Sequence, residues 1–183
     1  MPSCLGMYVQ DNLIKYAKVS KDHDKIKVDS FGVKFYENIN EAIKQVVEET
    51  YSYKTPISVN LEQEMYNYFD MFSLLNKTDL QKAIKTEFDA FCQDKGYNPN
   101  AFEKRSAVVP NTDDRQKLKV IHVSENKIEF NKMLQLFSGY RVTAASPISM
   151  TIPNLKEFEP KQNYLIVNIE DQTTVTTIID QQI

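Results

Sequence analysis

Two strand–turn–strand patterns, one at each end of the chain, constrain the fold more than any other feature of the sequence. In the first, apolar and β-prone residues at 5–9 and 13–19 flank the polar turn Gln10-Asp11-Asn12. In the second, which spans residues 164–180, an apolar strand and a β-branched strand flank another polar turn. Two such runs separated by a short polar stretch predict a β-hairpin. We therefore expect one hairpin near each end of the chain.

The residues that follow the first hairpin predict a layered α/β unit. Lys25–Asp29 alternates strictly between polar and apolar residues, and Phe31, Val33 and Phe35 continue the alternation, which predicts a half-exposed strand. Asn38 with Glu41 resembles a capping box at the start of a helix. A further strand begins at Ile57. Residues 1–60 thus form the first part of one subdomain.

The middle of the chain predicts a second, inserted subdomain over residues 61–139. The aromatic run Met65–Phe72 is typical of a strand that is covered on both faces. A capping box at Thr78 opens a helix that Gly96 ends. Two strands follow, and Ser124 is expected to cap another helix that Gly139 ends. The order β-α-β-β-α predicts a small ferredoxin-like subdomain. Residues 140–183 then return to the first subdomain and begin a second half.

Composition excludes several classes of protein. A net charge of −3 with a pI near 5.5 argues against a nucleic-acid-binding surface, which needs an excess of Lys and Arg. Cys4 and Cys92 stand alone, so we expect neither disulfide nor zinc, and a reducing cytoplasm. Neither a signal peptide nor a membrane-spanning stretch is recognisable, so any membrane contact is expected to be indirect. Because the chain stops close to a strand, we expect the natural protein to continue past Ile183.

The turns of the two hairpins resemble the phosphate loops of actin-like ATPases. Residues 6–15, Gly-Met-Tyr-Val-Gln-Asp-Asn-Leu-Ile-Lys, are similar to the loop G-I-D-I-G-S-S-x-I-K of the PilM-type pilus assembly proteins. Residues 168–174, Asn-Ile-Glu-Asp-Gln-Thr-Thr, are similar to the second loop, D-I-G-x-x-x-T. The order of elements also resembles the first half of PilM-type proteins and the cytoplasmic domain of GspL-type secretion proteins. The resemblance implies an actin-like/ribonuclease H-like subdomain of the α/β (α+β mixed) class.

Four substitutions in these loops predict that the chain does not hydrolyse nucleotide. Tyr8 replaces the acidic residue that handles magnesium, and Asn168 replaces the second aspartate. Gln10 and Glu170 replace glycines that let backbone N–H groups approach phosphate oxygens. We therefore expect no catalytic residue and no cofactor, with ATP and magnesium disfavoured. If a nucleotide does bind, the resemblance implies these contacts: Asp11, Asn12, Lys15, Asn168, Thr173 and Thr174.

Other residues with reactive or metal-binding side chains are interpreted as structural. Asp22-His23-Asp24 has ligand residue types, but it falls at a hairpin tip without further ligands, so no metal site is expected. His122 falls in a strand and is interpreted as packed or partner-facing. Asp113-Asp114 lies in a polar loop. Cys92 has no neighbouring base in the sequence that would make it a nucleophile.

The aromatic strand is where a functional interpretation competes with a structural one. Its large side chains either form the core of the inserted subdomain or line a groove for a partner, because Tyr, Phe and Met are enriched at interface cores. PilM-type proteins bind the short cytoplasmic N-terminus of a membrane partner between the first and inserted subdomains, so the resemblance implies a groove nearby. The candidate partner-binding residues are Tyr66, Tyr68, Phe69 and Phe72.

These observations predict a pseudo-ATPase scaffold rather than an enzyme. The resemblance implies a cytoplasmic protein, peripheral at the inner face of the cell membrane, in a type IV pilus or type II secretion-like assembly platform. Its partners would be a PilN-like membrane protein and the assembly ATPase. An active actin-like ATPase, with Asp11, Lys15, Thr173 and Thr174 in an altered loop, and an FtsA-like cell-division filament protein remain as alternatives.

Overall fold

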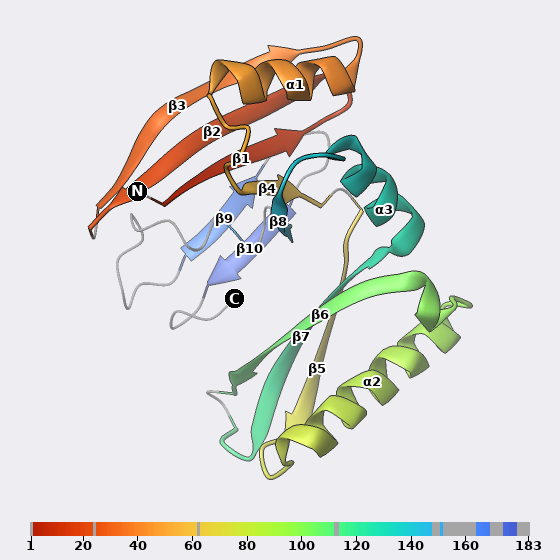
Figure 1. Cartoon of the computed structure of the whole chain (residues 1–183). Coiled ribbons are helices and arrows are strands. Elements are labelled where there is room, and N and C mark those ends of the chain that lie inside the picture. The colour runs from red at the N-terminus through yellow and green to blue at the C-terminus, as the bar shows by residue number, and fades with distance from the viewer. Residues whose placement is uncertain are drawn as a thin grey trace. The chain divides into compact units, whose positions relative to one another are not determined.

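The computed structural model describes residues 2–23, 25–61, 63–111, 114–147, 151, 164–168 and 174–178. The chain divides into two compact units, one formed by Met1–Glu62 with Lys132–Ile183 and the other by Gln63–Asn131. Each unit combines a β-sheet with a helix, as Figure 1 shows. The mixed α/β class predicted from the sequence is confirmed. No helix among the described residues is both long and apolar enough to cross a membrane.

The first unit contains a five-stranded sheet with the order β3-β2-β1-β4-β8. The first three strands form an antiparallel meander, whereas β1, β4 and β8 run parallel. The hairpin predicted at the start of the chain is therefore confirmed. The strands are β1 Ser3–Val9, β2 Leu13–Asp22, β3 Lys25–Phe35, β4 Ile57–Asn60 and β8 Val142–Ser146.

The core of the first unit lies between this sheet and helix α1, Ile39–Glu49. The Asn38 side chain accepts hydrogen bonds from the N–H groups of Asn40 and Glu41, which confirms the predicted N-cap. Apolar residues recur every three or four positions, so one side of α1 faces the sheet. The buried residues of α1 are Ala42, Ile43, Val46 and Val47, and they pack on Leu5, Met7, Val9, Ile14, Ile57, Val59 and Phe137.

A two-stranded antiparallel sheet follows near the end of the chain. It consists of β9, Tyr164–Asn168, and β10, Thr174–Ile178. This pairing confirms the second predicted hairpin. Its turn, residues 169–173, lies outside the described residues.

The second unit is a three-stranded antiparallel sheet with one long helix along one face, α2 in Figure 1. The strand order is β5-β7-β6. Along the chain the elements follow the predicted β-α-β-β order, with helix α3 next. Their bounds are β5 Met65–Phe72, α2 Lys77–Asp94, the 3-10 turn Pro99–Ala101, β6 Phe102–Pro110, β7 Lys117–Asn126 and α3 Lys127–Leu136.

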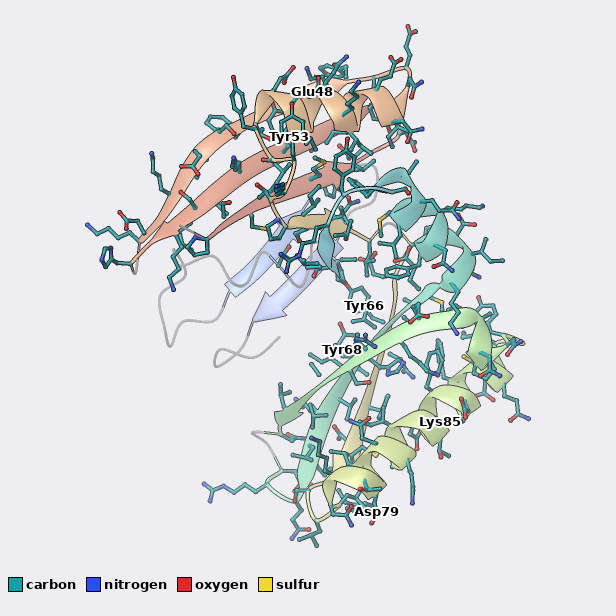
Figure 2. The ribbon with its side chains drawn as sticks, viewed as in Figure 1. Glu48, Tyr53, Tyr66, Tyr68, Asp79 and Lys85 are labelled. Carbon is teal, nitrogen blue, oxygen red and sulfur yellow. The ribbon has the colours of Figure 1, made fainter. Side chains whose placement is uncertain are left out.

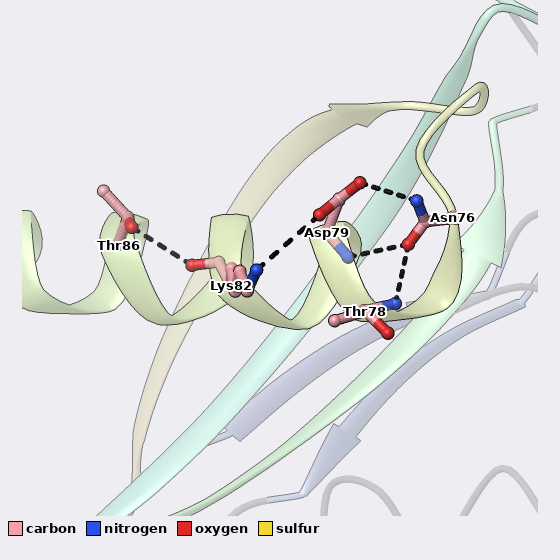
Figure 3. Close-up of polar contacts among 5 residues, drawn as sticks. All are labelled: Asn76, Thr78, Asp79, Lys82 and Thr86. Carbon is pink, nitrogen blue, oxygen red and sulfur yellow. Dashed lines mark hydrogen bonds and ion pairs between the residues drawn. The ribbon is translucent and has the colours of Figure 1, made fainter.

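Both helix starts predicted for this part of the chain are wrong by a few residues. Asn76 caps α2, because its Oδ1 accepts from the N–H groups of Thr78 and Asp79 at 3.0 Å each (Figure 3). Ser124 lies within β7, and the Asn126 Oδ1 accepts from the Ile128 N–H at 2.8 Å instead. Asparagine is as good an N-cap as serine or threonine, so capping residues two positions apart compete.

The prediction that the aromatic strand is covered on both faces is also wrong. Its odd-numbered residues face α2, and Met71 is 8% exposed in a cluster with Ile84 and Val120. Its even-numbered residues point away from α2, and Tyr68 is 60% and Phe72 68% exposed. One face of the strand is therefore core, and the other is open.

Candidate functional site

A cleft of about 340 Å³ lies along strands β1, β2, β4 and β8 of the first unit. Most of its residues share the sheet face that does not carry α1, because Gly6 pairs directly with Ala17 and Ser58, and Tyr8 with Lys15. The lining residues are Gly6, Met7, Tyr8, Lys15, Tyr16, Ala17, Ser58, Val59, Asn60, Ser146 and Thr151. Among the sequence candidates that the structure describes, Lys15 lines this cleft.

The described lining of the cleft does not fit a magnesium ion. Lys15 Nζ lies 5.3 Å from the centroid of the Tyr8 ring, so a cation and an aromatic ring occupy the place where the resemblance expects an acidic residue. No carboxylate is among the described residues that line the cleft, whereas Mg²⁺ is held by carboxylate oxygens, waters and phosphates. The described residues of the cleft supply instead one ammonium group, several hydroxyls and an amide.

The turn of the first hairpin is held together by its own hydrogen bonds. The Gln10 N–H donates to the Leu13 carbonyl at 2.9 Å, and the Asn12 carbonyl accepts from the Tyr36 N–H at 3.0 Å. The Tyr36 hydroxyl donates to the Gln10 carbonyl. A phosphate would have to displace the first of these bonds to reach the Gln10 N–H. Asp11 and Asn12 are exposed at this turn and do not line the cleft.

The residues expected from the second loop are described only at its base. Asn168 ends β9 and Thr174 begins β10, and these two residues pair directly. Thr173, Glu170 and Asp171 lie outside the described residues.

Asn60, which sequence reasoning missed, joins two strands beside the cleft. Its Oδ1 accepts from the Val9 N–H at 2.8 Å, and its Nδ2 donates to the Val9 carbonyl at 3.0 Å. The side chain is 8% exposed. A polar residue that directly follows the apolar strand residues Ile57 and Val59 was the signal available in the sequence.

The candidate partner-binding residues divide between the two faces of β5. Tyr66, Tyr68 and Phe72 lie on the face away from α2, where the two tyrosine rings stack with centroids 6.2 Å apart (Figure 2). Phe69 lies on the other face and packs against the core cluster around Met71. The structure therefore brings together three of the four candidates and assigns the fourth to the core.

His122 is packed within the second unit and is 2% exposed. Its Nδ1 is 2.7 Å from the Ser106 hydroxyl, and its ring centroid is 4.5 Å from that of Phe88. Burial, and secondarily the nearby Lys104 ammonium, lower the pKa of His122 to about 4. The imidazole is thus neutral at physiological pH.

The remaining candidates that the structure describes lie at a hairpin tip, in a loop and at a buried position. His23 contacts Asp22 at 2.8 Å at an exposed hairpin tip, while Asp24 and Asp113 lie outside the described residues. Asp114 accepts from the Gln116 N–H within its loop. Cys92 is fully buried, and burial raises the pKa of its thiol. Within the described part of the chain, no three His, Cys, Asp or Glu side chains come together as a metal site.

Comparison with solved structures identifies the fold. A chain of the PilM–PilN type IV pilus biogenesis complex superposes with a TM-score of 0.72 at 13% identity, covering 97% of this chain and 62% of that one. The cytoplasmic domain of EpsL, an inner-membrane component of the type II secretion system of Vibrio cholerae, gives a TM-score of 0.60 at 12% identity, covering 96% and 71%. The predicted resemblance to PilM-type and GspL-type proteins is confirmed as a likeness of fold.

A third structure is more distant. It is a protein with an actin-like ATPase fold and unknown function from Bacteroides thetaiotaomicron, with a TM-score of 0.47 at 9% identity, covering 98% of this chain and 66% of that one. No protein-family model matches the sequence, and neither does any curated protein. The chain spans about 62% of the length of the pilus protein that it resembles.

Proposed function

We propose that this protein is a cytoplasmic scaffold of an inner-membrane assembly platform of the type IV pilus or type II secretion kind. The observation that carries the proposal is the likeness of fold, over 97% of the chain, to a protein from a pilus biogenesis complex. The likeness to the EpsL cytoplasmic domain supports the same class of machine. In this role the protein binds the cytoplasmic tail of a PilN-like membrane protein and couples it to the assembly ATPase.

The open face of β5 supports a role in binding an extended peptide. Tyr68 and Phe72 expose most of their surface there, beside the stacked Tyr66. Among the described strands, β5 pairs only with β7, so its other backbone edge is available for an added strand. The opposite edge strand, β6, carries Lys104 and Arg105, and charged residues of this kind protect an edge from pairing. The difference between the two edge strands thus favours β5 as the strand to which a peptide adds.

The cleft supports a scaffold that works without hydrolysing nucleotide. The Lys15–Tyr8 pair and the closed turn at Gln10 leave neither a magnesium-binding carboxylate nor a glycine-lined phosphate loop among the described residues. Phosphoryl transfer depends on both a positioned metal ion and such a loop. The active-ATPase alternative therefore requires chemistry that the described residues of the first loop do not supply.

The partner-binding role is tested by calorimetric titration with synthetic peptides. The peptides are the N-terminal cytoplasmic tails of the single-pass inner-membrane proteins encoded in the same genome cluster, each with a scrambled version. We expect one tail to bind, and Tyr66→Ser with Tyr68→Ser to abolish that binding without unfolding the protein. Tyr53→Ser is the matched control, because Tyr53 is also an exposed tyrosine, at 61%, but lies in the other unit (Figure 2). Normal binding by the double variant would place the site elsewhere.

The nucleotide-independent role is tested by thermal denaturation with and without Mg-ATP. A ligand present at 100 times its dissociation constant stabilises a protein by about 2.7 kcal/mol, which is roughly 5–10 °C for domains of this size. We expect no shift. A shift of that size, together with phosphate release, would favour the ATPase alternative over the scaffold.

A further inference from the structure

A row of five apolar side chains is exposed along β3, the edge strand of the five-stranded sheet. The exposed fractions range from 53% for Val33 to 79% for Phe31. A strand with one solvent-facing side normally turns its polar residues outward, so this is the reverse of the expected pattern. We call this row the apolar strip; it consists of Ile26, Val28, Phe31, Val33 and Phe35.

A register shift places all five residues on one face. Val28 pairs with Val19, whereas Phe31 pairs with Ala17, and the pairing shifts between Lys18 and Val19. Because Val19 and Ala17 are two residues apart in β2, they share a face, and so do their partners. Without the shift, Ile26 and Val28 would lie on the opposite face from Phe31, Val33 and Phe35. The shift therefore makes the strip continuous.

The strip lies on the sheet face that does not carry α1. On the other face, Lys34 forms an ion pair with Glu49 of α1, and Lys18 donates from its Nζ to the Thr50 carbonyl at the end of that helix. Its direct neighbours in β2 on the same face are apolar at Leu13, Ala17 and Val19 and charged at Lys15 and Lys21. No described helix covers the strip, since its residues are more than half exposed.

The size and composition of the strip fit a second copy of the same chain. Its five side chains expose on the order of 600 Å², given that a large aromatic side chain presents about 150–250 Å². This area lies at the upper end of the range found for the largest apolar patch on a typical monomer. For comparison, a standard interface buries about 800 Å² per partner. The strip itself contains no charged side chain, so its five residues bury no unpaired charge when two strips face each other, while Lys15 and Lys21 lie beside it on β2. An isologous contact needs a self-complementary patch of this kind.

We propose that β3 is a homodimer interface, in which the apolar strips of two copies pack face to face across a two-fold axis. Sheets that pack in this way lie about 10 Å apart, with their side chains interdigitated. Phe31, in the middle of the strip, lies closest to the axis. This inference does not depend on the proposed scaffold function.

Sedimentation velocity and light scattering on the 183-residue chain test the proposal. We expect twice the 21.2 kDa chain mass at about 50 µM. Phe31→Glu with Phe35→Glu should weaken the dimer about 100-fold or more, as the loss of central apolar contacts does at other interfaces. Lys27→Glu is the matched control, because Lys27 lies on the same strand but pairs with Ser20 on the α1 face. This control should remain dimeric.

A cross-linking experiment covers the case in which the double variant fails to fold. In a Cys4→Ser background, Phe31→Cys should form a disulfide-linked or bismaleimide-linked dimer, and Lys27→Cys should not. A chain that is monomeric at 100 µM would overturn the proposal. So would a monomer that floats with anionic vesicles through the same strip, or a dimer that the Phe31 and Phe35 substitutions leave intact.

Discussion

Acidification is expected to destabilise the second unit through His122. The folded state holds this side chain neutral, with its pKa lowered to about 4, whereas an unfolded histidine titrates near 6.5. Between these values the unfolded chain binds a proton that the folded chain does not bind. The free energy of unfolding therefore falls as the pH falls below about 6.5, and this loss ends near pH 4.

The magnitude follows from the size of the pKa difference. Each pH unit within the window costs up to about 1.4 kcal/mol. From pH 7.5 to pH 5.0 the contribution of His122 is about 2 kcal/mol. This is a large part of the stability of a small domain, and it is independent of the carboxylates that titrate at lower pH.

Urea unfolding followed by circular dichroism at both pH values measures this effect. His122→Phe removes the titrating group and keeps an aromatic ring beside Phe88, while the exposed Ser106 hydroxyl can bond to water. The variant is expected to lose about 2 kcal/mol less than the parent over this pH range. His23→Asn is the control, because His23 is exposed at a hairpin tip and its φ of 54° suits asparagine.

Two results would refute the reasoning. Parallel pH dependence in the parent and His122→Phe would mean that His122 is protonated in the folded state as readily as in the unfolded state. If His23→Asn reduced the loss of stability between pH 7.5 and pH 5.0 as much as His122→Phe does, the pH dependence would not come from the burial of His122 against Phe88.

Three further substitutions test individual contacts, each by urea denaturation at pH 7.5. Asn60→Ala should cost about 1–3 kcal/mol, because it leaves the buried Val9 N–H and carbonyl without their side-chain partner; a change below 0.5 kcal/mol would contradict this role. Tyr51→Gly should stabilise the protein by about 0.5–1 kcal/mol, since Tyr51 has a φ of 50° just after α1, where glycine is favoured; destabilisation would show that the Tyr51 ring makes contacts worth more than the strain. Asn76→Ala should lower the free energy of unfolding by about 1 kcal/mol, whereas Asn76→Ser should change it little, because serine is also a good N-cap. Unchanged stability in Asn76→Ala would mean that Thr78 caps the helix instead.

Local sequence patterns predicted most of the secondary structure. Alternation in the first hairpin and spacing of apolar residues in α1 gave elements whose type and position the structure confirms. The errors came where two local signals of similar strength compete. Asn76 and Thr78 both suit an N-cap, and Ser124 reads equally well as a cap or as a strand residue. In each case long-range strand pairing or packing decides, and neither is visible in a short window of sequence.

The candidate site was predictable in part. Lys15 was identified through the resemblance to a phosphate loop, and it does line the cleft. Asn60, Ser58 and Ser146 enter the cleft only because β4 lies parallel beside β1 and β8 lies parallel beside β4. Since these strands are far apart in the sequence, their neighbourhood depends on the fold and not on any local motif.

The sequence by itself determined the alternation of polar and apolar residues, the two hairpins, the β-α-β-β order of the middle segment and the residues Tyr8 and Gln10 in the first turn. The tertiary structure alone decided which face of each strand is buried. In β5 it placed Phe69 in the core and left Tyr68 exposed, because α2 covers one face only. In β3 it left Phe31 and its apolar neighbours exposed, because α1 packs on the opposite face of the sheet and a register shift brings Ile26 and Val28 onto the same face as Phe31. A period of two tells which residues share a face, but only the packing of other elements decides which face is covered.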